Sequence, residues 1–460
     1  MKKIGIDEKH FIYEDCIIND AIKKVEENGL GIVFVLSANN IVIGSISKGD
    51  LTRFIQKNKD NFGNKFVTSC MTRNVVTVSN NTPRRKIIYQ FDKNVRIIPQ
   101  VDESNRPVSI ISADSFDFPF NRKTLAKAKA PMRISFAGGG TDLSYYFSDN
   151  LGVVISTTIN KYAYAGLEKR ADSKIIIKSI DYSTVEEFET INQINYNGNT
   201  SLIKAIIKLL RPEYGFNLTT HSEVYPGSGL GGSSSLATAV IGCFNKFRMD
   251  ELSLHEIAEL SFQAERIELA IKGGWQDQYS AVFGGLNHME FSNKDIIVRP
   301  LRLKQSLRDE LESSLILCDT GNVRNSGHIH SDQQKKFKED KSQYNYMEQT
   351  KNLALDMENS MLRGDFKQFS YLLSQGWELK KKFSDQISNS LVDDLYNYGL
   401  KNGALSGKLL GAGGGGHLLF YVNLERKKEL MNKLSEIGKK CEAVNFDEQG
   451  LRCWTVNQEM

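Results

Sequence analysis

A glycine- and serine-rich segment near the middle of the chain has the composition of a phosphate-binding loop. It follows a run predicted as a strand (residues 216–224) and precedes a predicted helix. Glycines let backbone N–H groups approach an anion, and a helix N-terminus adds roughly half a positive charge. The spacing matches neither a Walker A motif nor a Rossmann fingerprint. The candidate phosphate-binding residues are Pro226, Gly227, Ser228, Gly229, Leu230, Gly231, Gly232, Ser233, Ser234 and Ser235, and we call them the central glycine loop.

Two further glycine clusters lie on either side of the central loop. The first cluster (residues 130–143) is a predicted strand that runs into a glycine-rich turn, where a carboxylate is well placed to bind sugar hydroxyls. The third cluster (residues 408–417) has four consecutive glycines before a predicted strand. Glycines are entropically costly, so this run predicts close approach to a ligand or to another backbone segment. The candidate substrate-binding residues here are Gly139, Gly140, Thr141, Asp142, Gly413 and Gly414.

A helix predicted over residues 255–271 carries two candidate acids. Glu265 shares its helical face with apolar residues, including Phe262. A carboxylate on such a face is costly unless it pairs with a cation or binds a metal. Both a salt bridge to Arg266 or Lys272 and a metal site satisfy this requirement, and Glu268 is the competing acid.

Asp277 and Arg324 complete the candidate site. Asp277 follows a glycine pair and precedes a run with a buried character. An anion-binding loop, a metal ligand, a cation and a carboxylate beside the nucleophile are what phosphoryl transfer needs. Arg324 lies in a segment rich in hydrogen-bonding residues (residues 319–326), where its guanidinium could hold a second, non-transferred phosphate. The alternative for this segment is a solvated turn before a charged helix.

The elements that position these residues fall into two parts. In the first ~120 residues two similar sets of strands and helices follow each other, and Asp50 and Asp114 lie 64 residues apart. This spacing predicts a tandem repeat of one βαββα unit. Residues 121–129 are basic and predicted as a linker. From Ala130 the sequence changes to strands rich in β-branched residues and to long helices.

The composition excludes several classes of protein. The chain has 460 residues, with 59 basic and 55 acidic side chains, a balance too even to indicate nucleic-acid binding. No stretch approaches the ~18 apolar residues of a membrane-spanning helix, so a soluble, cytoplasmic protein is expected. The six cysteines form no CxxC pair and are predicted as free thiols. His328 and His330 are predicted to lie in a polar loop, without a metal site.

The three glycine clusters, in this order, resemble the three motifs of the GHMP small-molecule kinases over residues 130–457. Residues 133–143, 273–279 and 408–416 are most similar to bacterial D-glycero-D-manno-heptose 7-phosphate kinases, and L-fucose kinases share much of the pattern. The resemblance implies an α+β fold, with subdomains at residues 130–310 and 311–460 and the active site between them. It further implies ATP as the phosphoryl donor, bound by the central glycine loop.

The resemblance also implies roles for individual residues. Asp277 would orient or accept the proton of the acceptor hydroxyl. Arg133 would hold Asp277 and neutralise charge on the transferred phosphoryl group. Glu265 and Ser233 would bind Mg²⁺, and a shift of register by one residue leaves Ser234 as the alternative ligand. Asp142 would bind the substrate.

The implied reaction is phosphorylation of the anomeric hydroxyl of a sugar phosphate, in the synthesis of bacterial surface-polysaccharide precursors. The expected substrate is D-glycero-D-manno-heptose 7-phosphate, converted to the 1,7-bisphosphate. One alternative is a fucokinase-like enzyme that acts on an unphosphorylated sugar. The other is a catalytically silent nucleotide-sensing module.

The N-terminal repeat resembles a pair of cystathionine-β-synthase (CBS) modules, through residues 42–51 and 70–78. That family often binds adenine nucleotides with a Ser/Thr-x-x-Asp pattern, which here falls on Ser47 and Asp50. The second repeat has Ile111 at the hydroxyl position and keeps only Asp114. The alternative role is a dimerisation platform, and a homodimer is expected.

Overall fold

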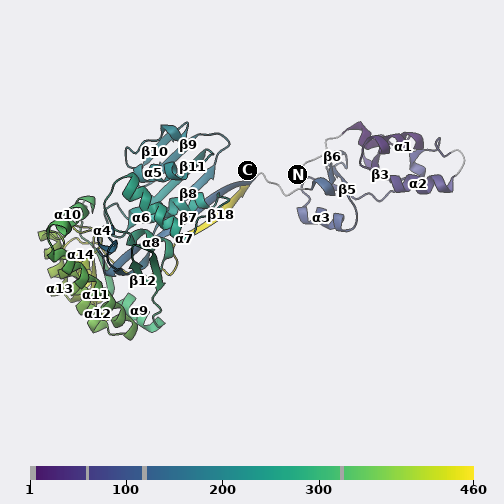
Figure 1. Ribbon diagram of the computed structural model, residues 1–460. Helices are drawn as coiled ribbons and strands as arrows, with labels where there is room; N and C mark the ends of the chain where they lie inside the picture. The colour runs from purple at the N-terminus through teal and green to yellow at the C-terminus, as the bar shows by residue number, and fades with distance from the viewer. Residues whose placement is uncertain (1–6, 59–61, 117–121, 322–325, 460) are drawn as a thin grey trace. The chain divides into compact units, whose positions relative to one another are not determined.

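The chain folds into two compact units, Met1–Asn121 and Arg122–Met460, in the computed structural model shown in Figure 1. The structure describes residues 7–58, 62–116, 122–321 and 326–459. Among these residues, no helix is both long enough and apolar enough to cross a bilayer. All six cysteines are free thiols, as the sequence predicts.

The first unit confirms the predicted tandem repeat. Each repeat has a three-stranded sheet in which the middle strand is parallel to the first and antiparallel to the third. The first repeat contains β1 (Phe11–Tyr13), α1 (Ile18–Glu27), β2 (Ile32–Leu36), β3 (Val42–Ser47) and α2 (Lys48–Lys57). The second contains β4 (Val78–Ser79), α3 (Arg84–Asp92), β5 (Ile97–Val101), β6 (Pro107–Ser112) and the short helix η3 (Ala113–Ser115).

Apolar periodicity explains how each repeat closes. Ile18, Ala21 and Val25 recur at helical spacing on α1, and all three are buried in the cluster that also contains strand residues. On β2, Val33 and Val35 face the same cluster as α1, whereas Phe34 and Leu36 are buried on the other face in a cluster with Val101 and Ile110.

The second unit is built on an eight-stranded sheet of order β10-β9-β11-β8-β12-β13, with β7 paired to β8 and β18. Helices α5 to α8 gather around α6, which packs on β7 and β8 (Figure 1). The strands are β7 (Arg122–Ala137), β8 (Gly152–Lys169), β9 (Ile175–Ser179), β10 (Thr184–Phe188), β11 (Phe216–Ser222), β12 (Leu286–Phe291), β13 (Ile296–Pro300) and β18 (Arg452–Glu459). The helices are α4 (Ser144–Phe147), α5 (Ser201–Leu210), α6 (Gly232–Asn245), α7 (Leu254–Phe262), the π-helical turn η5 (Gln263–Glu268) and α8 (Gln276–Phe283).

The remaining elements form a second α+β layer around a four-stranded sheet of order β15-β16-β14-β17. Its strands are β14 (Leu315–Asp319), β15 (Ala404–Leu409), β16 (His417–Val422) and β17 (Cys441–Ala443). Its helices are α9 (Gln305–Ser313), α10 (Ser326–Glu339), α11 (Ser342–Arg363), α12 (Phe366–Lys381), α13 (Ser390–Lys401) and α14 (Leu424–Glu436). Two α+β subdomains thus share one unit, as the fold class predicted.

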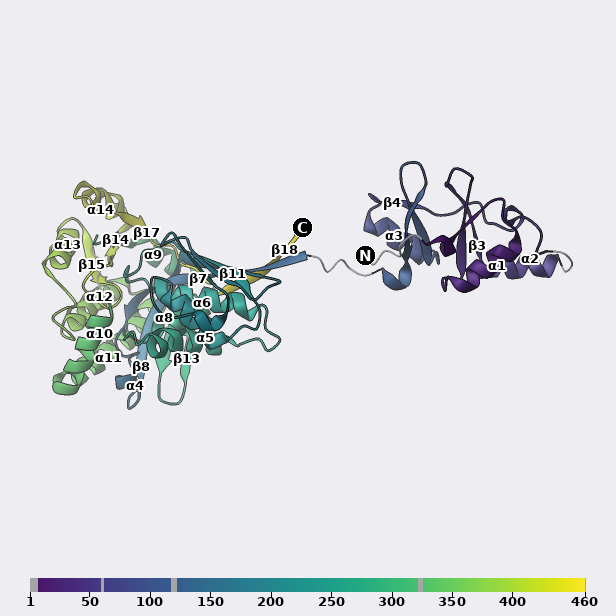
Figure 2. The same ribbon diagram turned by 90° about the horizontal axis from the view of Figure 1, so that it is seen from above.

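Two predicted boundaries differ from the structure. Residues 122–129, expected to be linker, are the first half of β7, which pairs with β18 along its length (Figure 2). Ala126, Ala128 and Ala130 are buried because they alternate with lysines along the strand. The chain's last strand also returns to the first subdomain, so the second subdomain does not extend through residue 460.

Candidate active site

The central glycine loop forms a concave backbone turn at the N-terminus of α6. Gly227, Gly229 and Gly231 have φ angles of 82°, 79° and 77°. This left-handed conformation favours glycine, and its alternation with other residues turns successive N–H groups toward one side. Helix α6 begins at Gly232, so the positive end of its dipole adds to the same site.

Glycines also let the third cluster touch the central loop. A Cβ on Gly411 would lie 2.6 Å from the Cα of Gly229, and one on Gly416 would lie 2.6 Å from the carbonyl oxygen of Ser228. Gly413 and Gly414 instead approach the backbone of Ile387, whose carbonyl accepts from the Gly414 N–H at 2.8 Å. Close backbone approach, one of the two predicted roles, is therefore observed for these glycines, and Gly413 also lines the cavity described next.

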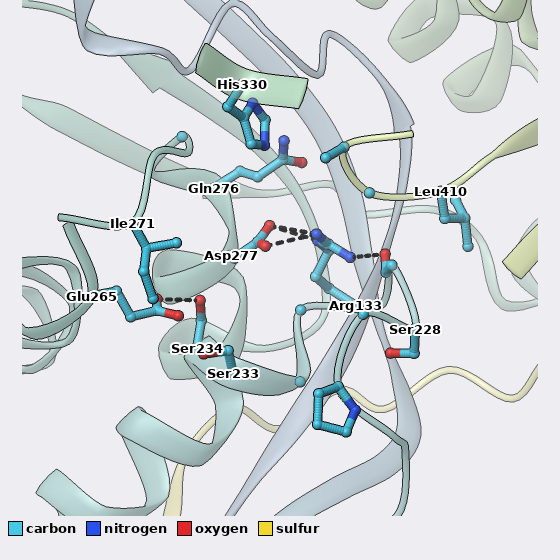
Figure 3. Close-up of a pocket in the computed structure, with 18 of the residues that line it drawn as sticks. Arg133, Ser228, Ser233, Ser234, Glu265, Ile271, Gln276, Asp277, His330 and Leu410 are labelled. Atoms are coloured by element: carbon cyan, nitrogen blue, oxygen red, sulfur yellow. Dashed lines mark hydrogen bonds and ion pairs between the residues drawn. The ribbon is translucent and has the colours of Figure 1, made fainter. Parts of the chain in front are cut away.

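The three clusters surround one cavity of about 670 Å³ (Figure 3). Most of the predicted site residues line it: Arg133, Gly139, Gly140, Asp142, Pro226, Gly227, Ser228, Gly229, Gly231, Gly232, Ser233, Ser234, Glu265, Asp277 and Gly413. Four predicted residues do not: Thr141, Leu230, Ser235 and Gly414. Arg324 lies outside the described residues.

Two of the predicted residues outside the cavity lining, Thr141 and Ser235, use their hydroxyl groups in hydrogen bonds to the backbone. Thr141 Oγ1 donates to the carbonyl of Gly138 at 2.8 Å. Ser235 Oγ donates to the carbonyl of Pro131 at 2.8 Å and so ties the central loop to the first cluster. Leu230 is fully buried, and its carbonyl accepts from the Arg133 N–H.

Arg133 and Asp277 form a bidentate pair in the cavity. Arg133 Nε and Nη2 donate to the two carboxylate oxygens of Asp277, each at 2.7 Å. Arg133 Nη1 also donates to the carbonyl of Gly229 at 2.6 Å, which fixes the guanidinium against the central loop. Paired planar donors of this kind give both charge neutralisation and a fixed geometry. Figure 3 shows the pair at the centre of the site.

Glu265 lies beside Ser234, not beside Ser233. Ser234 Oγ donates to Glu265 Oε2 at 2.7 Å, and both side chains are buried, whereas Ser233 is exposed (Figure 3). Gln278 Nε2 also donates to Glu265 Oε2, at 2.5 Å. The competing acid, Glu268, accepts instead from the Tyr196 hydroxyl at 2.7 Å. The phase of α6 therefore places Ser234, the alternative metal ligand of the sequence analysis, next to Glu265, the acid favoured there over Glu268.

Ser234 and Glu265 suit a magnesium ion that is bound together with a nucleotide. Hydroxyl and carboxylate oxygens are the hard ligands that Mg²⁺ prefers, and the ion commonly takes its other ligands from phosphates and water. The described residues contain no cluster of three or more His, Cys, Asp or Glu side chains able to hold a metal without such help.

Asp142 is held in a narrow position beside the Arg133–Asp277 pair. It is buried, and it accepts from the N–H groups of Gly140 at 2.9 Å and Gln276 at 3.1 Å. A Cβ on Gly274 would lie 2.0 Å from Asp142 Oδ2, so the glycine makes room for the carboxylate. Burial raises the pKa of Asp142, and the two backbone hydrogen bonds oppose this shift.

Sequence analysis missed two lysines at the site. Lys380 comes from α12 and donates to the carbonyl of Gly411, and burial lowers its pKa to about 8. Lys408 donates to the carbonyl of Phe136 at 3.0 Å, and burial lowers its pKa as well. Lys380 shares a helical face with the buried Trp377 and Leu373. This spacing in the sequence could have predicted that Lys380 points into the protein.

His330 also lines the cavity, and it lies on helix α10 rather than in a polar loop. Its Nδ1 is 3.1 Å from Gln333 Oε1. Burial lowers the pKa of His330 to about 4, and the nearby charge of Arg266 contributes. Arg324, in the segment 319–326, was the sequence-based candidate for the second phosphate, and it lies outside the described residues.

The predicted nucleotide residues of the first unit form a helix cap. Ser47 Oγ accepts from the Asp50 N–H at 3.2 Å, and Asp50 Oδ2 accepts from the Ser47 N–H at 2.8 Å. This reciprocal capping box starts α2. In the second repeat Ser112 caps η3 and accepts from the Asp114 N–H, so a hydroxyl lies one residue after the position of Ile111.

Several known proteins resemble the second unit along most of its length. The D-glycero-alpha-D-manno-heptose 7-phosphate kinase of Campylobacter jejuni is 36% identical over 336 residues, which cover 72% of this chain and 99% of that protein. The L-fucokinase/L-fucose-1-P guanylyltransferase of Bacteroides fragilis is 28% identical over 321 residues, covering 63% of this chain and 34% of that protein.

A crystal structure described as a D-glycero-D-manno-heptose 1-phosphate kinase from Bacteroides thetaiotaomicron has a TM-score of 0.60 at 32% identity. It covers 72% of this chain and 98% of its own. A putative sugar kinase from Campylobacter jejuni also has a TM-score of 0.60, at 35% identity, and covers 73% of this chain and 99% of its own.

Family models match both units. The GHMP kinases N terminal domain matches residues 201–285, and the GHMP kinases C terminal domain matches residues 357–440. The CBS domain matches twice, at residues 4–57 and 67–116. The chain is therefore a member of the GHMP kinase family, an ATP-dependent phosphotransferase preceded by a CBS pair.

Proposed function

We propose that the enzyme transfers the γ-phosphoryl group of ATP to the anomeric hydroxyl of D-glycero-D-manno-heptose 7-phosphate. The product is the 1,7-bisphosphate, a precursor for bacterial surface polysaccharides. The observation that carries this proposal is the Arg133–Asp277 pair, which shares one cavity with the central glycine loop and with Asp142. The heptose phosphate kinases among the similar proteins support the choice of sugar.

The side chains divide the work of phosphoryl transfer. The central glycine loop and the α6 N-terminus bind the phosphates of ATP. Asp277 accepts the proton of the attacking hydroxyl, and Arg133 holds its carboxylate in place and offsets negative charge. Ser234 and Glu265 would hold Mg²⁺, which when bound neutralises charge on the phosphate oxygens. Asp142 accepts hydrogen bonds from hydroxyls of the sugar.

An assay across acceptors tests this proposal. ADP release is measured with D-glycero-D-manno-heptose 7-phosphate, the heptose 1-phosphate, the free heptose and L-fucose, and ³¹P NMR locates the new phosphate. We expect the 7-phosphate to have the highest kcat/KM and its product to carry a second phosphate at the anomeric carbon. A higher kcat/KM for the 1-phosphate or for an unphosphorylated sugar would refute the assignment.

The two alternatives make different predictions in the same assay. A fucokinase-like enzyme releases ADP with L-fucose, in keeping with the Bacteroides fragilis relative. A catalytically silent module releases no ADP with any acceptor. The intact Arg133–Asp277 pair and the Ser234–Glu265 pair both argue against the silent module.

A further inference from the structure

Arg266 lines the active-site cavity and lies in a π-helical turn. Helix α7 ends at Phe262 and continues as η5, Gln263–Glu268. Such turns shift the helical phase and are frequent at functional sites. Here two consecutive residues both line the cavity: Glu265 contacts Ser234, and Arg266 follows it.

The guanidinium of Arg266 has unused hydrogen-bonding capacity. Its Nε is buried and has no hydrogen-bond partner among the described residues. Its nearest carboxylate oxygen is Glu265 Oε2, which lies 3.9 Å from Nη2 and already accepts from Ser234 and Gln278. The Arg266 side chain is 13% exposed, so water does little to replace the missing partners. A buried charged donor without a partner is costly, and a bound anion would remove that cost.

The chain leaves space for the guanidinium. A Cβ on Gly273 would lie 2.6 Å from Arg266 Cζ, so the guanidinium packs directly against the backbone of this glycine. Arginine presents its donors as a rigid fork that matches the oxygens of a phosphate group. A lysine at this position would keep the positive charge but lose the paired donors.

The charges around Arg266 favour an anionic ligand. Lys272 lines the same cavity, and the positive charges of Arg266 and Lys380 both help to lower the pKa of His330. Arg133, by contrast, is already paired with Asp277. Among the described residues that line the cavity, five basic side chains (Arg133, Arg266, Lys272, Lys380 and Lys408) face four carboxylates (Asp142, Asp181, Glu265 and Asp277).

We infer that Arg266 binds the phosphate monoester that the acceptor sugar already carries, and so makes the enzyme select a phosphorylated acceptor. This inference rests on the proposed function, since it names the residue that recognises the non-transferred phosphate. The transferred phosphoryl group has its own partners in the central glycine loop, Arg133 and the Ser234–Glu265 pair. Arg266 is thus a specificity residue for the acceptor.

Three variants of the full-length chain test the inference. Arg266→Gln removes the charge and the fork, Arg266→Lys keeps the charge alone, and Arg299→Gln is a control on the exposed strand β13, away from the cavity. For Arg266→Gln we expect KM for heptose 7-phosphate to rise about 10–150-fold, the effect of losing one hydrogen bond to a charged group. Arg266→Lys should fall between this variant and the wild type.

The specificity of the effect is the decisive readout. In Arg266→Gln, KM for ATP and kcat/KM for the free heptose should stay within about threefold of the wild type. Inorganic phosphate should compete with heptose 7-phosphate in the wild type, and it should lose this inhibition in the variant. Circular dichroism of each variant checks that the fold is kept.

Other outcomes overturn the inference in distinct ways. An equal rise in KM for ATP would make Arg266 a nucleotide ligand. An equal fall in kcat/KM for heptose 7-phosphate and for the free heptose, seen in both Arg266→Gln and Arg266→Lys, would show that Arg266 has only a structural role. The proposed function is decided by the wild-type enzyme alone. If the wild type prefers another sugar phosphate, the heptose 7-phosphate assignment fails, and the role of Arg266 is then tested with the preferred substrate. If it uses only unphosphorylated sugars, both fail.

Discussion

At the scale of single residues, substitution of Asp277 is the strongest test of the proposed phosphoryl transfer. Asp277→Asn keeps the size of the side chain but cannot accept a proton or pair ionically with Arg133. We expect kcat to fall roughly 10²–10⁴-fold, the usual effect of losing general-base help. ATP affinity, measured by calorimetry, should change little. The exposed Asp309→Asn is the control, and a near-normal kcat for Asp277→Asn would refute the assignment of the base.

Lys380 gives the site a pH dependence. Burial and the charge of Arg133 together lower the pKa of Lys380 to about 8, although the carboxylates of Asp142 and Asp277 oppose the shift. Lys380 is therefore charged below pH 8 and loses its charge as the pH rises through that value. Because a cation beside the phosphates stabilises the transition state, we expect kcat/KM to fall on the alkaline side of about pH 8.

Substitution of Lys380 separates this residue from other causes of alkaline loss. Lys380→Arg keeps its charge at high pH, so the alkaline fall should move upward or disappear. Lys380→Met should be slow at every pH. Lys381→Arg, at the neighbouring position paired with Glu378, is the matched control. An unchanged alkaline limb in both Lys380 variants would show that another group titrates.

Site residues were predictable where residue type and local motif carry the information. Asp142, Glu265 and Asp277 lie in short segments whose residue types indicate their chemistry, and Arg133 was implied by the family resemblance. The structure brings all four into one cavity. The choice between Ser233 and Ser234 depends on the phase of α6 relative to a helix far along the chain. Sequence periodicity cannot fix that relation, because it is set by tertiary packing.

At the scale of elements, the contact between the third glycine cluster and the central loop can be tested by a matched pair of glycines. Gly411 and Gly438 have nearly equal φ angles, 73° and 75°. A Cβ on Gly411 would lie 2.6 Å from the Cα of Gly229, whereas one on Gly438 would meet nothing within 4 Å. Alanine strains the backbone equally at both positions, so any difference reports the close contact.

We expect Gly438→Ala to cost about 1–2 kcal/mol of unfolding free energy from left-handed strain alone. Gly411→Ala should cost more and should displace the central loop, lowering kcat/KM for ATP by up to about 10²-fold. Thermal unfolding and ATP kinetics measure the two effects. Equal stability losses, with normal ATP kinetics in Gly411→Ala, would show that the contact does not position the loop.

Elements were predictable where one period runs through a segment without interruption. The strands and helices of the N-terminal repeat follow this rule, and their order was correct. The first part of strand β7, residues 122–129, was missed because Ala126 and Ala128 are weakly apolar, although their alternation with lysine is the period of a strand. The π turn of η5 has no sequence period of its own, so the position of Arg266 was not foreseen.

At the scale of the whole molecule, the open question is what the CBS pair does for the kinase. The first unit has its own hydrophobic clusters, which contain Val33 and Ile98. Its Ser47–Asp50 pair serves as a capping box, so the same atoms have a structural role besides any ligand. A nucleotide role and a dimerisation role therefore have to be separated by variants that keep the cap.

Asp50→Asn and Asp50→Ala form that pair of variants. Asparagine can still accept the backbone hydrogen bond from Ser47, whereas alanine cannot and should lower the free energy of unfolding by about 0.5–1.5 kcal/mol, the net value of one hydrogen bond. If Asp50 binds the ribose of an adenine nucleotide, both variants should weaken AMP binding to the full-length chain, measured by calorimetry. If Asp50 only caps α2, Asp50→Asn should bind AMP as the wild type does.

Coupling between the units would appear as a change in kinase kinetics. Saturating AMP should shift KM or kcat of the wild-type enzyme by about 5–150-fold, the range of typical coupling free energies. By reciprocity, the heptose phosphate should change the affinity of the enzyme for AMP by the same factor by which AMP changes the affinity for the heptose phosphate. Sedimentation measured with and without AMP follows the oligomeric state. A chain that dimerises without binding AMP, ADP or ATP at the CBS pair would leave dimerisation as the role of this unit, because no ligand would then exist to carry the coupling.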